Sequence, residues 1–200
     1  MNYGKSRKRA LKSGLGALAL LAGTAGLALA AGRNSGGVDT TGWNDPHKPF
    51  QIYGNTYYVG TAQRSSILIT SEFGHVLIDG GLPESAPRIK ASIEALGFKL
   101  TDVKAILNSH THPDHAGGIA ELQKLSGADV YALRPANDVL TTGRPTADDP
   151  QAATRGIGIP KVSRVWVAQD DQQIGIGSIR MRAIATPGHT PGGTTWTWDA

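Results

Sequence analysis

The chain has 200 residues, of which 40% are hydrophobic and 18% charged, so it is long enough for one globular domain with a sizeable core. It contains no cysteine, which excludes a disulfide scaffold, a cysteine-based zinc site and a thiol nucleophile. Residues 1–30 hold five basic residues and no acid, so removing them from the total charge of +4 leaves −1. This near-neutral remainder argues against a nucleic-acid partner.

Residues 1–30 have the pattern of a secretory signal peptide. A cationic stretch ends at Lys12, an apolar run covers 15–29, and small residues precede a cleavage site after Ala30. The apolar run is shorter than the roughly 20 residues that a membrane span needs. We therefore predict a signal peptide over 1–30 and a periplasmic or secreted domain over 31–200 that has no stable membrane span. The run 7–9 leaves both the general secretory and the twin-arginine export routes open.

The next segment predicts strands followed by a helix. β-branched and aromatic runs indicate strands over 56–59, 66–71 and 75–79. Apolar residues at helical spacing predict a helix over 83–96, with Gly97 as its cap. We expect one apolar face of this helix to cover the sheet.

A strand–loop–helix–strand unit follows. An apolar strand is expected over 103–107, a histidine-rich turn over 108–118, a short helix from Ile119 that ends at Gly127, and a strand over 130–133. Functional groups in such units gather in the loop at the carboxyl end of the strand, which here is the histidine-rich turn.

The last third of the chain predicts a long loop and then strands. Residues 143–160 are rich in Gly, Pro, Thr and Asp, which indicates a mobile flap or a disordered stretch. Strands are then expected at 162–167, 173–176, 179–185 and 194–198. Because the sequence stops within the last of these strands, we expect it to be part of a longer protein, and we expect the 200 residues alone to be poorly folded and inactive.

Three of the six histidines lie within one short turn, at His110, His112 and His115, with Asp114 among them. In an extended turn, residues two apart project to the same side, so His110 and His112 can bind one cation. Asp114 and His115 can then face a second cation. Imidazole and carboxylate without sulfur suit zinc, although iron or manganese tolerate the same donors. A surface patch or an adventitious metal site is the competing interpretation.

His189 supplies a third imidazole from a distant loop, TPGHTPGG over 186–193. Two ligands from one loop and a third from another leave one position of a tetrahedral zinc open for water, which is the arrangement of catalytic zinc. A satisfied buried histidine is the alternative role for His189.

Two runs, NSHTHPDHAGG over 108–118 and TPGHTPGGTTWTW over 186–198, preceded by VLIDGG over 76–81, resemble the metallo-β-lactamase superfamily. The resemblance covers nearly all of the chain from residue 51 onward. His115 directly after Asp114, the lack of cysteine and the run after His189 are most similar to subclass three of the class B β-lactamases. The resemblance implies an α+β fold, the αββα sandwich of that superfamily, of which the first half and part of the second are present.

The same resemblance implies the metal ligands. His110, His112 and His189 would hold one zinc, and Asp114 and His115 a second, which gives two ions per subunit in the full-length protein. The family's remaining ligand to the second zinc is a downstream histidine, and the sequence has none after His189. Around these ligands, Asp79, Ser109, Thr111 and Thr190 are candidates for supporting hydrogen bonds, and Asp79 resembles an acidic residue of the superfamily. The alternative, preferred for the three hydroxyls, is that each satisfies a local turn.

The implied activity is hydrolysis of a β-lactam antibiotic, in which metal-bound hydroxide attacks the lactam carbonyl and Asp114 both binds metal and orients the hydroxide. Trp43 and Tyr53 are candidates to flank the substrate, or anchors of the sandwich. The alternatives are a lactonase or a glyoxalase-II-like thioesterase on the same fold, or an inactive metal-binding fragment. A nucleic-acid-processing relative is disfavoured by the charge and by the predicted export.

Overall fold

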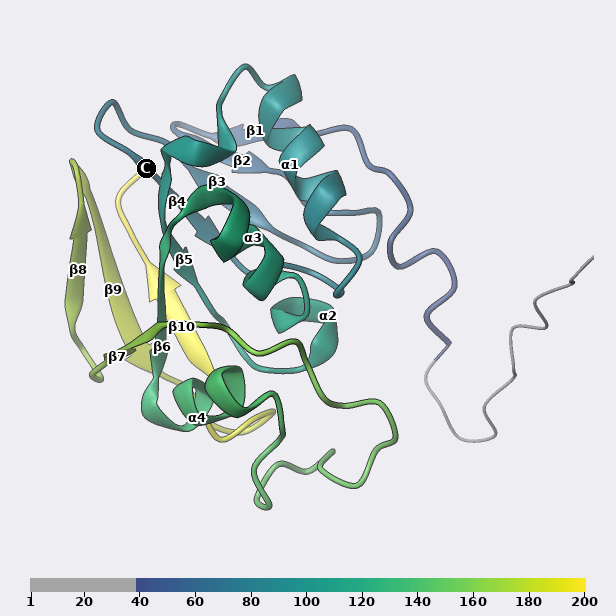
Figure 1. Cartoon of the computed structure of the whole chain (residues 1–200). Helices are drawn as coiled ribbons and strands as arrows, with labels where there is room; N and C mark the ends of the chain where they lie inside the picture. The colour runs from purple at the N-terminus through teal and green to yellow at the C-terminus, as the bar shows by residue number, and fades with distance from the viewer. Residues whose placement is uncertain (1–38) are drawn as a thin grey trace, which may run out of the picture. The chain divides into compact units, whose positions relative to one another are not determined.

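The computed structural model describes residues 39–200, and the predicted signal peptide lies outside this range. Two β-sheets form the framework (Figure 1). The larger sheet contains, in spatial order, β1 (Phe50–Tyr53), β2 (Thr56–Tyr58), β3 (Ile67–Ile69), β4 (His75–Ile78), β5 (Val103–Leu107), β6 (Asp129–Leu133) and β7 (Val165–Ala168). The smaller sheet contains β10 (Thr194–Thr197), β9 (Ile179–Ala185) and β8 (Gln173–Ile176).

The larger sheet changes from antiparallel to parallel at β4. Strands β1 to β4 form an antiparallel meander, and β4 to β7 run parallel. Parallel neighbours need crossovers, which contain the helices α1 (Ala86–Ala95), α2 (Pro113–Ala116), α3 (Ile119–Ser126) and α4 (Arg134–Thr142), and the short 3-10 helix η1 (Leu100–Asp102). None of the helices in the described range has the length and apolar character needed to cross a bilayer.

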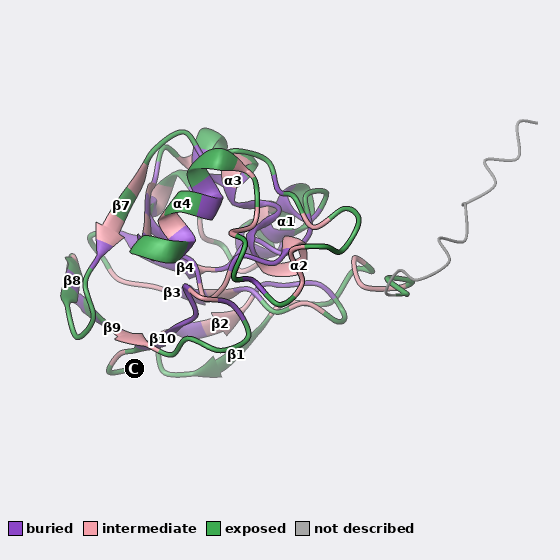
Figure 2. Ribbon diagram, turned by 90° about the horizontal axis from the view of Figure 1, so that it is seen from below, coloured by how far each residue is buried: buried purple, intermediate pink, exposed green. Residues whose placement is uncertain are grey.

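The larger sheet has a hydrophobic core on each face. On one face, Ile89 of α1, Leu122 of α3 and Leu140 of α4 pack with Leu77 and Ile106 of the sheet. On the other face, apolar side chains of the smaller sheet pack against the larger one, among them Met181 and Trp196. In Figure 2, β1 is green because all of its residues are exposed, whereas β8, β9 and β10 mix buried and exposed residues. The predicted mixed fold is confirmed, and residues 39–200 supply one helical layer and both sheets of the sandwich.

Several predicted boundaries were wrong for local reasons. The helix predicted from residue 83 begins at Ala86, because the Ser85 hydroxyl accepts the Leu82 N–H at 3.0 Å and keeps the chain in a turn. The helix predicted after the histidine turn is present as α3, but the turn itself also contains α2. Helix α4 was missed, although Pro135 in its first turn and the buried Val139 and Leu140 on one face are helical signals.

The 143–160 segment forms neither a helix nor a strand, but it is not loose along its whole length. Asp149 and Ile159 are only 5% and 7% exposed. The strand predicted from residue 162 begins at Val165, because the N–H of Val162 donates to the carbonyl of Leu140 on α4 instead of joining the sheet. The long loop is therefore anchored to the helical layer at its end.

Candidate metal centre

The histidine-rich turn lies where β4 and β5 end. Asp79 directly follows β4, and His110 and His112 follow β5 before α2 begins. The backbones pack tightly here: the Gly80 N–H donates to the His115 carbonyl at 2.7 Å. A Cβ on Gly118 would lie 2.2 Å from the Gly80 carbonyl oxygen, so only glycine fits at this contact.

His189 reaches this turn through the hairpin of β9 and β10. The Thr194 N–H, at the start of β10, donates to the Ser109 carbonyl at 2.7 Å. The indole N–H of Trp196 donates to the Asn108 carbonyl at 3.0 Å. These two hydrogen bonds attach β10 to the histidine turn and place the loop that carries His189 beside it.

The predicted ligands come together in two overlapping sets. His110, His112 and His189 form what we call the three-histidine cluster, in which one nitrogen of each ring lies within 4.8 Å of the others. His110, Asp114 and His115 form the carboxylate cluster, with the same limit on distance. His110 belongs to both. In the three-histidine cluster, Nδ1 of His112 lies 3.0 Å from Nε2 of His189.

The outward nitrogens of two rings have hydrogen-bond partners. Nε2 of His112 lies 3.3 Å from Oδ1 of the buried Asp149. Nδ1 of His110 lies 3.2 Å from the Ser109 hydroxyl. Each partner favours a proton on the outer nitrogen and leaves the inner one, Nδ1 of His112 and Nε2 of His110, as a free electron pair.

Asp79 forms hydrogen bonds that hold residues of the carboxylate cluster in place. Its Oδ2 accepts hydrogen bonds from Nδ1 of His115 at 2.9 Å and from the Ser109 hydroxyl at 2.5 Å, while Oδ1 accepts the Ser109 N–H at 2.7 Å. Its backbone is left-handed, with φ of 62°, which aspartate tolerates better than most residues. One buried carboxylate thus contacts His115 directly and His110 through Ser109, and Asp79 was among the candidates for such hydrogen bonds.

The two adjacent rings differ in proton affinity. Burial lowers the pKa of His110 to about 4, and the charge of His115 adds to this effect. Burial also disfavours the charged form of His115, but the hydrogen bond and charge of Asp79, together with the charge of Asp114, raise its pKa above the usual value. His110 is therefore neutral at pH 7, the form in which an imidazole binds a metal. The inward-facing nitrogens, the carboxylate and the anchored outer nitrogens fit a divalent cation.

Arg64 is a further member of the site that the sequence did not indicate. Its Nε lies 2.9 Å from Oδ2 of Asp114, and the two side chains are 18% and 22% exposed. The guanidinium stacks over the ring of Trp43, 3.1 Å from its centroid. Trp43, predicted to flank the substrate, thus contacts Arg64, whereas Tyr53 is 72% exposed on β1.

The other predicted supporting residues are buried beside the cluster. The Thr190 hydroxyl is buried without a hydrogen-bond partner, while the Thr190 carbonyl accepts the Gly188 and Gly193 N–H groups and shapes the His189 loop. Thr111 is 3% exposed. Asp149, which the sequence analysis missed, comes from the long loop, and nothing in its local sequence indicated a partner.

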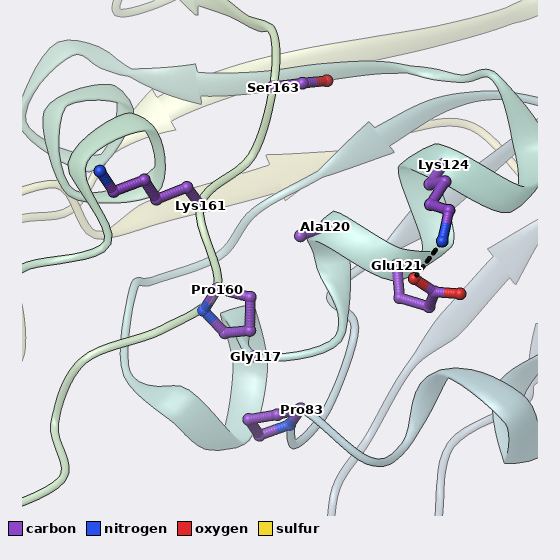
Figure 3. Close-up of a pocket in the computed structure, with 8 residues that line it drawn as sticks. All are labelled: Pro83, Gly117, Ala120, Glu121, Lys124, Pro160, Lys161 and Ser163. Carbon is purple, nitrogen blue, oxygen red and sulfur yellow. Dashed lines mark ion pairs between the residues drawn. The ribbon is translucent and has the colours of Figure 1, made fainter.

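A groove of about 610 Å³ lies between α3 and the segment before β7. Figure 3 shows Pro83, Gly117 and Pro160 at one end of it and an ion pair of Lys124 with Glu121, 3.5 Å long, at the other. None of the histidines lines this groove. The charged side chains that line the groove are exposed, and none of the candidate metal ligands lies among them. The histidine clusters are therefore the candidate functional site.

Comparison with known proteins identifies relatives of two kinds. The family model described as the metallo-beta-lactamase superfamily matches residues 59–199. Among solved structures, the Rm3 metallo-beta-lactamase is 53% identical with a TM-score of 0.78, over 81% of this chain and 60% of that one. MEM-A1, a subclass B3 metallo-beta-lactamase from a soil metagenome library, is 51% identical with a TM-score of 0.75, over 78% of this chain and 59% of that one.

A curated relative of the second kind is a hydroxyacylglutathione hydrolase of Rhodopseudomonas palustris. It is 32% identical over 140 residues, which are 66% of this chain and 45% of the relative. The chain therefore spans about half the length of this relative, and about 60% of the length of the two solved structures.

Proposed function

The chain belongs to the metallo-beta-lactamase superfamily of hydrolases, and on this premise we propose that the protein is a zinc-dependent enzyme that opens the lactam ring of β-lactam antibiotics. The observation that carries the proposal is the contrast in identity between the two kinds of relative. Solved β-lactamases are 53% and 51% identical to it over about four fifths of the chain, against 32% over two thirds for the hydroxyacylglutathione hydrolase.

The geometry supports a division of roles. His110, His112 and His189 would hold one zinc, and Asp114 and His115 would hold a second, because the candidate ligand atoms of each cluster lie within 4.8 Å of one another. Bound zinc lowers the pKa of a water ligand to about 7 and so supplies hydroxide at neutral pH. Asp114 orients the attacking water, and Asp79 and Asp149 keep the rings of His115 and His112 turned inward.

A thioesterase that acts on hydroxyacylglutathione is the second candidate, and the match to the curated hydrolase favours it. The metal ligands set the hydrolytic chemistry, while substrate choice depends on the walls of the site. The two candidates therefore share the histidine clusters and differ in what the rest of the site admits.

The deciding experiment uses protein purified from its complete gene. We expect a carbapenem to lose its absorbance on mixing, a chelator to abolish this loss and added zinc to restore it. Hydroxyacylglutathione, assayed in parallel, should be a far poorer substrate. Faster turnover of hydroxyacylglutathione would reverse the assignment, and activity that resists chelation would remove the metal from the mechanism.

We further propose that the protein is exported, since residues 1–30 have the pattern of a signal peptide. N-terminal sequencing of the protein from the periplasm or medium should start near Ala31. Intact residues 1–30 on protein found only in the cytoplasm would contradict export.

A further inference from the structure

The two clusters differ in the charge that surrounds them. In the carboxylate cluster, Oδ2 of Asp114 lies 2.9 Å from Nε of Arg64 and 3.6 Å from Nε2 of His115. Among residues 39–200, Arg64 is the only arginine or lysine that forms an ion pair with a member of either cluster. The carboxylate expected to attract a second cation is therefore already partly neutralised by the chain itself.

Arg64 is held in place from several sides. The face of Trp43 covers its guanidinium, which restricts the side chain to one region. The backbone carbonyl of Arg64 accepts the Thr61 N–H at 2.9 Å, and the Thr61 hydroxyl donates to the Trp43 carbonyl at 2.6 Å. The turn that carries Arg64 and the segment that carries Trp43 are thus joined, so the positive charge is fixed beside Asp114.

A fixed guanidinium can act on a neighbouring cation by repulsion and by pairing with one of its ligands. Arginine stays protonated at any pH at which the protein is folded, and at this depth the interaction is only partly screened by water. It would repel a divalent ion in the carboxylate cluster and compete with that ion for Asp114. The three-histidine cluster has imidazole donors only, and Asp149 faces the outer nitrogen of one of them.

On the basis of the proposed function, we propose that Arg64, positioned by Trp43, lowers the zinc affinity of the carboxylate cluster, so that the three-histidine cluster fills at lower zinc concentration. Arg64 acts through Asp114 and does not bind the metal. It would make the protein a one-zinc enzyme at low zinc concentrations and a two-zinc enzyme only when zinc is abundant.

The test is a zinc titration of the metal-free protein, made from its complete gene, against a chromophoric chelator that resolves two stepwise affinities. Arg64→Leu should raise the weaker affinity at least about tenfold and leave the tighter one nearly unchanged. Arg64→Lys keeps the charge and should stay close to the wild type. Trp43→Leu, which frees the guanidinium, should give a smaller rise than Arg64→Leu.

Arg164→Leu is the matched control, because it removes an arginine from an exposed pair with Asp129 outside the clusters. It should change neither affinity. If Arg64→Leu lowers the weaker affinity or leaves it unchanged while Arg64→Lys matches the wild type, Arg64 does not oppose the second ion and the inference is overturned. If the wild type and every variant bind no zinc, the proposed function itself fails.

Discussion

The three-histidine cluster and the carboxylate cluster share His110 but are built in opposite ways. The first joins two segments that are far apart in sequence, and its donors are all imidazoles. The second lies within six consecutive residues, contains a carboxylate and faces the fixed charge of Arg64. The comparison shows that a local motif can supply ligands while tertiary contacts decide how strongly they bind.

The largest expected effect comes from His110→Ala, because it removes a donor of the three-histidine cluster from the middle of the site. We expect loss of the more tightly bound zinc and a fall in carbapenem hydrolysis of at least about 10³-fold. His189→Ala, the matched variant, removes another donor of the same cluster, and both variants should retain one weakly bound zinc at Asp114 and His115. Retention of both zinc ions in either variant would show that the substituted histidine does not bind metal.

Asp79→Asn tests the shared support beneath the two clusters. Asparagine tolerates the left-handed backbone at this position, so the substitution removes the charge while the fold is expected to persist. The weaker support of His115 and Ser109 should reduce zinc affinity by about 10- to 100-fold, measured by competition with a chelator. Unchanged affinity in a folded variant would mean that Asp79 only fixes the local backbone.

Asp149→Asn should affect one cluster alone, because Asp149 contacts His112 and no ligand of the carboxylate cluster. We expect the tighter zinc affinity to fall by roughly tenfold, at the lower end of the usual range for such partners, and the weaker one to hold. The same titration measures both. A fall in the weaker affinity instead would show that Asp149 supports the carboxylate cluster and not the three-histidine cluster.

The smallest effect is expected outside the clusters, at His75. Burial lowers the pKa of His75, so the folded state prefers its neutral form. Its contribution to stability is complete above the unfolded pKa of about 6.5 and is lost as pH falls through the lower folded value. The stability advantage of the wild type over His75→Gln, from denaturant unfolding at pH 7.5 and 5.5, should therefore narrow at the lower pH. A larger stability advantage of the wild type at pH 5.5 than at pH 7.5 would contradict the lowered pKa of His75 in the folded state.

The candidate ligands within the histidine-rich turn were predictable from the sequence. The residues that folding brings to this turn from elsewhere in the chain were only partly predictable. The spacing of His110, His112, Asp114 and His115 showed which residues could bind metal, since their proximity is fixed by the chain itself. His189 was identified from its glycine- and proline-rich loop. Its placement depends on hydrogen bonds of β10 to the histidine turn, which no local pattern encodes.

Asp149 and Arg64 were missed for the same reason. Both approach the cluster through tertiary packing, one from a loop that looked unstructured and one from a turn between two strands of the meander. The sequence predicted the strands from β2 onward because alternation and β-branched residues are local signals, but it missed β1, and it began β7 three residues too early. Helix α4 was missed although its pattern is local, because it follows β6 directly and its proline resembles a turn signal.

Elemental analysis, combined with equilibrium dialysis at fixed free zinc, tests the metal centre most directly. Wild-type protein purified from its complete gene should hold about one zinc per chain at low free zinc and about two at high free zinc, and His110→Ala should hold none at low free zinc. Protein that is folded, free of chelator and still without a stoichiometric transition metal would rule out the metal centre and the hydrolytic function built on it.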